Sequence, residues 1–367
     1  MGIGSVLAII VVPRYFSSKI FIYLLFYSLF VILNLMIGDE YYHDFVNVVI
    51  EIATLLLVSS MTYYLFKYND KKLMTSIIYS VLFIVIFTSI ATFIIDIKLP
   101  GIIRELQHEI NDGNTSAAKP LYRLGLSNYS LPHAVPVLIP ALIMGFRQRN
   151  TSKFNRFVCL VALCLCVLLT YVSGATTPVL LAVLILIISL ITKRGETKKN
   201  TTRMVILLLI ALPFFTSDNL MADILRFSQD IVGGEGPIHE RLVELENAAL
   251  YGDTSGDLES RSILYKKSFN TFFSNIIIGS NSGFGGHSAL IDRLATLGII
   301  GFLPYVLFII AQIKLTIRYI PSQYISYYVI GIAAAVFMLA FKNMSNWEMW
   351  FLTFTVLPIM IYRFSKE

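Results

Sequence analysis

Apolar runs separated by short polar connectors dominate the sequence. Each run holds about 20 mainly apolar residues, the length that a helix needs to cross a hydrocarbon core of about 30 Å. Helices are the expected conformation, because a backbone in lipid has to satisfy its own hydrogen bonds. The expected spans are 20–37, 45–66, 73–95, 129–146, 154–172, 175–192, 203–216, 288–313, 324–342 and 348–363, with residues 1–12 as a candidate for an eleventh.

Basic residues gather in alternate connectors between these runs. The set comprises Arg14, Lys19, Lys67, Lys71, Lys72, Arg147, Arg149, Lys153, Arg156, Lys193, Arg194, Lys198, Lys199, Arg203, Lys314, Arg318, Arg363 and Lys366, which is 18 of the 29 lysines and arginines. The positive-inside rule assigns such connectors to the cytoplasm. Two long segments, about 96–128 and 217–287, are then extracytoplasmic. We expect a bacterial-type inner or plasma membrane, with any chemistry on its outer face.

Composition supports this interpretation. The chain has 367 residues, of which 56% are hydrophobic and 14% charged, whereas a soluble domain carries about 25% charged residues. The fold class expected is therefore all-α, with about 10–11 transmembrane helices in one integral membrane domain over 1–367. The loop 217–287 is expected to contain short helices, near 219–229, 237–250 and 259–273. The net charge of +6 lies in the connectors, which argues against nucleic acid as a partner.

His287 is the candidate for proton transfer. It follows the glycine-rich stretch 279–286 and precedes a predicted span. Glycines let a ligand approach the backbone closely, and a helix N-terminus favours an anion. A histidine titrates near neutrality and can accept or donate a proton. The alternative is an interfacial histidine that is hydrogen-bonded to its own loop.

Three arginines of the outer segments are candidates for binding phosphate oxygens. Arg261 begins an expected amphipathic helix, Arg241 lies in the same long segment, and Arg123 precedes span 129–146. The planar guanidinium presents two parallel donors that match a phosphate. Each arginine taken alone is better explained by a structural role such as a surface ion pair, for instance with Glu259. Together with His287 on one face of the membrane, they make a stronger hypothesis.

Ionisable residues also occur within the spans. Asp292 and Arg293 lie one to two turns inside span 288–313, and Glu51 lies inside span 45–66. Charged groups at such depth are costly and usually face the bundle interior. For Asp292, pairing with a basic group elsewhere in the bundle and a supporting role in catalysis are both open.

His133 lies between Pro132 and Pro136, which predict a kinked or broken entry to a span. A supporting role for His133 at a site is a second possibility. The three cysteines share one apolar run and behave as small hydrophobic residues: Cys159, Cys164 and Cys166. The sequence has no zinc-like spacing and no phosphate-binding loop, so we expect neither a metal nor a cofactor.

Three segments resemble the O-antigen polymerase and ligase superfamily, in particular the Wzy-type polymerases. The most specific is 279–301, in which a glycine and a histidine followed by a small polar residue lead into a helix with a Gly-x-x-Gly step. The second is 260–273, with Ser260-Arg261 and an aromatic run. The third is 123–134, an arginine-bearing segment before a span in the middle of the chain.

The resemblance implies a metal-independent membrane glycosyltransferase. Its donor and acceptor are oligosaccharides linked to undecaprenyl diphosphate, and further partners are a chain-length regulator and a flippase. His287 is implied as the catalytic residue, with Arg261, Arg123 and Arg241 binding the diphosphate. Asp292 and His133 are kept as candidates for a supporting role on the local features described above. The product is a surface polysaccharide such as O-antigen, capsule or exopolysaccharide.

Two alternatives stay open at this point. An O-antigen ligase transfers the glycan to a different lipid acceptor, and the sequence does not separate the two acceptors. A polysaccharide transporter or flippase more often has inverted repeats, interrupted spans and several charges near the bilayer midplane. The charges here crowd the long outer segment, which favours an enzyme.

Overall fold

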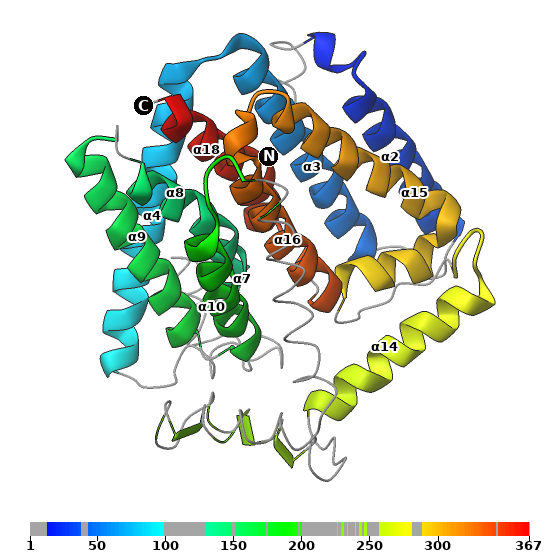
Figure 1. Cartoon of the computed structure of the whole chain (residues 1–367). Coiled ribbons are helices and arrows are strands. Elements are labelled where there is room, and N and C mark those ends of the chain that lie inside the picture. The colour runs from blue at the N-terminus through cyan, green and yellow to red at the C-terminus, as the bar shows by residue number, and fades with distance from the viewer. Residues whose placement is uncertain are drawn as a thin grey trace. The chain divides into compact units, whose positions relative to one another are not determined.

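The computed structural model describes residues 13–37, 43–98, 130–148, 151–173, 175–196, 257–280, 288–342 and 344–366, with a few isolated positions from 199 to 247 (Figure 1). These residues contain helices and no strand. The chain forms two compact units, residues 1–79 with 261–367 (unit 1) and residues 80–260 (unit 2). Each is described by itself below.

Unit 1 holds the first and last helices of the chain. Its elements are η1 (Pro13–Tyr15), α2 (Lys19–Ile37), α3 (His43–Tyr68), the start of α4 (Lys71–Lys98), most of α14 (Asp257–Ser274), α15 (Ala289–Ile317), η3 (Ser322–Tyr324), α16 (Ile325–Phe341), α17 (Trp347–Phe351), the π-helical η4 (Leu352–Val356) and α18 (Leu357–Lys366). The closest packing in this unit is between α2 and α15, and α3 packs against α2.

Unit 2 holds the rest of α4 and a group of helices that pack on one another. Its elements are α7 (Ser130–Ala134), η2 (Val135–Leu138), α8 (Ile139–Arg147), α9 (Lys153–Val172) and α10 (Thr176–Ile191). The kinked entry predicted from the prolines is confirmed, because a 3-10 segment, η2, interrupts the helix between α7 and α8. Pro136 lies within that segment.

Among the described residues, seven helical stretches are long and apolar enough to cross a membrane. They are Lys19–Ile37, Val46–Tyr68, Lys71–Lys98, Ser130–Arg147, Lys153–Val172, Ala289–Ile317 and Ser322–Phe341. Each agrees with a predicted span. The predicted span 175–192 is the shorter α10, span 348–363 is the interrupted run α17–η4–α18, and span 203–216 lies outside the described residues.

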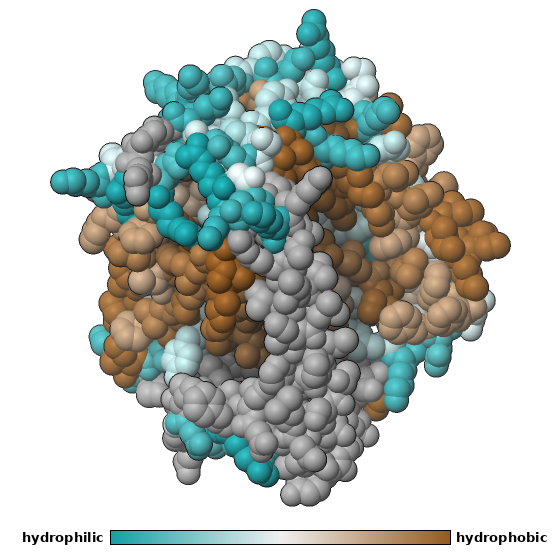
Figure 2. Space-filling model, viewed as in Figure 1, coloured by the Kyte–Doolittle hydropathy of each residue, from teal (hydrophilic) through white to brown (hydrophobic). Residues whose placement is uncertain are grey.

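Large apolar side chains cover the outer surfaces of these helices. Phe26 on α2 is 58% exposed and Phe83 on α4 is 67% exposed. In the region of α2 and α15, Figure 2 shows apolar side chains along the middle of the helices and hydrophilic ones toward their ends. Soluble proteins rarely expose continuous apolar surface of this kind, so these surfaces suit contact with lipid.

The basic connectors of unit 1 lie at one end of that unit. Phe66 of α3 stacks on Tyr319, just after α15, and the Tyr362 hydroxyl of α18 donates to the Asn69 side chain at 3.1 Å. The C-terminal ends of α3, α15 and α18 therefore lie together. These ends carry Lys67, Lys314, Arg318, Arg363 and Lys366, as the alternation of basic connectors predicts.

α15 is broken at Gly298. Its φ of 59° and ψ of −171° lie in a region that is essentially restricted to glycine. The break separates a half-helix, residues 289–297, from a longer half, residues 299–317. A break in a membrane helix releases backbone groups that have no water to bind, so other parts of the protein have to satisfy them.

The turn that follows α14 satisfies the groups released at the break. Three backbone hydrogen bonds join this turn to α15: Ile299 N to Ile276 O at 2.9 Å, Ile300 N to Ile277 O at 3.1 Å, and Ser280 N to Ala295 O at 3.1 Å. The Asn34 side-chain amide of α2 also donates to Thr296 O, at 3.3 Å. The two backbones approach very closely. A Cβ on Gly279 would lie 2.1 Å from Thr296 O, and a Cβ on Gly298 would lie 2.5 Å from Gly279 N.

Replacement of Gly298 by alanine tests this interlock. The alanine would have to adopt a backbone conformation that costs about 1–3 kcal/mol, and its Cβ would also collide with the 276–279 turn. We expect a lower unfolding temperature for the purified protein in detergent, measured by intrinsic fluorescence. The control is Ile300→Ala, because Ile300 is 52% exposed on the same helix. Equal unfolding temperatures for the two variants would contradict the interlock.

Candidate functional site

A buried ion pair joins α3 and α15 in unit 1. Arg293 Nη2 donates to Glu51 Oε1 at 2.6 Å, across 242 residues of sequence. Their side chains are 14% and 19% exposed. The Tyr27 hydroxyl of α2 donates to the same carboxylate oxygen at 3.1 Å and accepts from Arg293 Nε at 3.2 Å. Three helices thus meet at one charge pair.

The Arg293 guanidinium is fully hydrogen-bonded. Besides Tyr27 and Glu51, it donates through Nη1 to the Ala289 carbonyl and the Tyr305 hydroxyl, each at 3.2 Å, and through Nη2 to the Ser345 hydroxyl. An arginine has five N–H donors, and each of these has a partner here. Its Cζ also lies 4.8 Å from the centre of the Tyr305 ring, within cation–π range.

This saturation gives the pair a structural role. A substrate anion would have to displace existing partners of Arg293, whereas an arginine that binds phosphate keeps donors free for it. The sequence prediction that these ionisable groups face the bundle interior is confirmed for Glu51 and Arg293. The pair holds the half-helix 289–297 against α2 and α3.

Asp292 caps the start of α15. It is 7% exposed, and its carboxylate accepts from the Ser288 backbone N–H at 3.3 Å and from the Ser268 hydroxyl of α14 at 2.7 Å. The Ser288 hydroxyl in turn accepts from the Ile291 N–H at 3.0 Å. This reciprocal arrangement resembles a capping box with the acid one position further along. Asp292 therefore fixes the backbone immediately after His287 and also anchors α14.

The face of α14 that carries Ser268 is held against the rest of unit 1 by a second hydrogen bond. The Tyr265 hydroxyl donates to the Phe341 carbonyl at the end of α16 at 2.9 Å. Position 261 lies seven residues before Ser268, hence on the same helical face and about 10 Å along the axis. The structure describes the backbone at Arg261, and that position belongs to the anchored helix.

The described residues on either side of the segment that contains His287 are both hydrogen-bonded to α15. Residues 281–287 lie outside the described residues, but Ser280 before them bonds to Ala295, and Ser288 after them is bound by Asp292. Ser280 and Ser288 are therefore both bonded to the half-helix 289–297 of α15. The structure thus brings the neighbour of His287 and the helix of Arg261 to one end of unit 1.

The other predicted residues are placed less fully. Arg123 and Arg241 lie outside the described residues. His133 is fully buried in α7 of unit 2. Within the described part of the chain, no group of three His, Cys, Asp or Glu residues could hold a metal ion.

Sequence reasoning missed the hydroxyl partners of the charges. Tyr27, Tyr305 and Ser345 bind Arg293, and Ser268 binds Asp292. One signal was available for the first group, since an arginine deep in a span needs several acceptors. The sequence does not reveal which tyrosines and serines supply them, because the partners come from different helices.

Comparisons with protein-family models, with curated proteins and with solved structures found no match for this chain.

Replacement of Glu51 by glutamine tests the ion pair. The variant keeps the side-chain shape but leaves the buried Arg293 charge without its counter-ion, which typically costs about 3–5 kcal/mol. We expect a large fall in unfolding temperature, partly reversed in Glu51→Gln/Arg293→Met. The matched control is Arg226→Ala, which breaks a more exposed ion pair with Glu246 and should cost less than about 1 kcal/mol. Similar falls in unfolding temperature for Glu51→Gln and Arg226→Ala would exclude a structural role for the Glu51–Arg293 pair.

Proposed function

We propose that the chain is a membrane glycosyltransferase that polymerises oligosaccharide units linked to undecaprenyl diphosphate. In this proposal ten or eleven helices cross the bacterial plasma membrane. The loop 217–287 lies on the extracytoplasmic face, with His287 and the three arginines. The donor and acceptor reach this site from the lipid, and no nucleotide sugar, metal or cofactor takes part.

The proposed reaction is a displacement at the anomeric carbon of the donor sugar. A hydroxyl oxygen of the acceptor forms the new bond to that carbon, while the bond from the carbon to the diphosphate oxygen breaks. The electron pair leaves with the diphosphate, which Arg261, Arg123 and Arg241 stabilise. His287 accepts the hydroxyl proton as the oxygen attacks and later releases it to water.

The observation that best supports the proposal is that Ser280 and Ser288, the described residues on either side of the His287 segment, are both hydrogen-bonded to α15. A general base has to be held within hydrogen-bond reach of the proton it removes, and a loop is a poor support unless its ends are fixed. Here one end is joined to Ala295 and the other is capped by Asp292. Asp292 also binds Ser268 of α14, the helix on which Arg261 stands. Asp292 is therefore a positioning residue in this proposal.

A transporter or flippase is the second candidate, and two observations favour it. α15 is interrupted at Gly298, and the Glu51–Arg293 pair lies within membrane helices. Interrupted helices and buried charges are typical of transport sites. In this chain, however, the interruption is filled by the 276–280 turn and the arginine donors are all occupied. Both features therefore suit a rigid scaffold better than a transport site.

Variants of His287 test the proposed enzyme. In cells that lack the native chain, His287→Ala and His287→Gln should leave single repeat units on the surface in place of a ladder of long chains. With purified protein and lipid-linked repeats, we expect a 10²–10⁴-fold lower rate, the usual value of general-base catalysis. A transporter would instead give no polymer from purified components, even with the native protein.

The control for His287→Gln is His239→Gln, which alters a histidine of the same long segment that has no proposed role. Both variants should reach the membrane in normal amounts. Long chains made by His287→Gln at the native rate would remove His287 as the base. Long chains transferred only to a different lipid acceptor would identify a ligase.

Arg261→Lys tests diphosphate binding. A lysine keeps the charge but cannot reproduce the two parallel hydrogen bonds of a guanidinium. We expect most of the polymerisation rate to be lost and the donor KM to rise, measured with purified protein. The matched control is Arg226→Lys, because Arg226 pairs with Glu246 in the same segment and a lysine should serve there equally well. A native rate for Arg261→Lys would assign Arg261 to an ordinary ion pair.

A further inference from the structure

A pocket opens between α2 and α15 at the end of unit 1 that carries the basic connectors. Its volume is about 460 Å³, and its lining comprises Ser18, Lys19, Ile20, Tyr23, Tyr63, Leu307, Ile310, Ala311, Lys314, Leu315 and Arg318. This volume lies within the range of small-molecule sites, about 300–1,000 Å³. All the lining residues belong to unit 1. The pocket takes no part in the proposed polymerisation.

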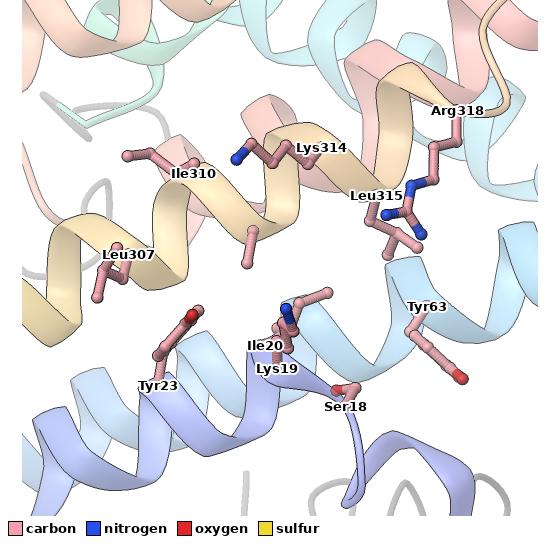
Figure 3. A pocket seen from close by; sticks show the side chains of 11 residues that line it. Ser18, Lys19, Ile20, Tyr23, Tyr63, Leu307, Ile310, Lys314, Leu315 and Arg318 are labelled. Atoms are coloured by element: carbon pink, nitrogen blue, oxygen red, sulfur yellow. The ribbon is translucent and has the colours of Figure 1, made fainter.

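The pocket exists because two helices that touch closely at one level diverge at another. At Gly301 of α15, a Cβ atom would lie 2.2 Å from the Phe30 ring of α2, so the helices can pack no closer there. Toward the start of α2 and the end of α15 they leave the space between Lys19 and Arg318 (Figure 3).

Among the described residues, three cations and no carboxylate line this space. Lys19 stands on α2, and Lys314 and Arg318 stand at the end of α15. Figure 3 shows the Lys19 and Arg318 side chains pointing from opposite helices toward the space between them. Within the described residues, none of the three side chains forms a hydrogen bond or ion pair. Three unneutralised cations around one space favour an anion with more than one oxygen acceptor.

The remainder of the pocket is apolar and leads along the helices. Leu307 and Ile310 of α15 and Tyr23 of α2 line this part of the pocket. Leu303 precedes Leu307 by one turn and Phe26 follows Tyr23 by one turn, so both continue the same helical faces. Leu303 is 51% exposed and Phe26 is 58% exposed. The pocket therefore passes from a cationic end to the apolar surface that suits lipid.

We infer that this pocket binds one anionic phospholipid. The phosphate lies between Lys19, Lys314 and Arg318, and an acyl chain follows Tyr23 and Leu307 toward the apolar surface. Basic pockets between membrane helices on the cytoplasmic side are suited to anionic headgroups, and the positive-inside rule assigns this end to the cytoplasm. The N-terminus of α2 at Lys19 adds a favourable field for the phosphate.

The test uses the full chain purified in a neutral detergent. Phosphatidylglycerol and phosphatidylcholine with identical acyl chains are titrated, and the unfolding temperature and the number of retained lipids by native mass spectrometry are measured. We expect saturable stabilisation by phosphatidylglycerol and little by phosphatidylcholine. The triple variant Lys19→Gln/Lys314→Gln/Arg318→Gln should bind phosphatidylglycerol roughly 100-fold more weakly, from the usual contribution of each cation.

Two further variants separate this pocket from general surface charge. Lys67→Gln/Lys71→Gln/Lys72→Gln removes the same charge from exposed positions that do not line the pocket, and it should bind like the native chain. Ala311→Trp fills the pocket without changing charge, and it should lose binding. Equal losses in the two glutamine triples would overturn the proposal, as would equal binding of the two lipids. Full competition by glycerol phosphate would assign the pocket to a soluble phosphate ligand instead.

Discussion

A backbone group in the membrane interior has no water to bind, and the form of unit 1 depends on how this chain meets that constraint at Gly298. The break frees groups of α15, and the turn 276–280 and Asn34 occupy them. Gly279 and Gly298 make this possible, because any side chain at either position would collide with the opposite backbone. Hydrogen bonds within the protein thereby offset the free-energy cost of the broken helix. The position of the turn after α14, up to Ser280, follows from the same contacts.

The charges around this break act as clamps rather than as a binding site. Arg293 uses all its donors on partners from α2, α3, α15 and the connector before α17. Asp292, the neighbour of Arg293 in sequence, has a different role. It joins α14 to the N-terminal cap of α15. Two adjacent ionisable residues thus fix two sides of one short half-helix. A rigid half-helix is what an exposed functional loop needs for its support.

Much of this architecture could be predicted from the sequence, because membrane spans and proline breaks are local properties. The apolar runs gave the spans to within a few residues, and Pro132 and Pro136 predicted the interruption between α7 and α8. The positions of Asp292, Arg293 and Glu51 indicated buried charges. Their partners could not be predicted, since Glu51 and Arg293 are 242 residues apart and no local pattern links them. Nor did the glycine-rich stretch reveal that Gly279 meets Gly298, because the contact depends on a positive φ at both residues. The chemistry proposed for His287 is still a prediction, as its side chain lies outside the described residues.

The separation of 242 residues between Glu51 and Arg293 determines the order in which the two charges are synthesised. α2 and α3 are synthesised early. Arg293 lies 242 residues after Glu51, so it is made on the order of tens of seconds later at usual translation rates. During that interval the carboxyl of Glu51 has no counter-ion, and an unpaired charge in hydrocarbon is costly. Until Arg293 is made, the nascent helix α3 is therefore expected to lie with Glu51 displaced toward the membrane surface. A chain that ends before α15 never acquires this partner for Glu51. The Glu51–Arg293 pair can therefore form only after the first half of α15 has been made.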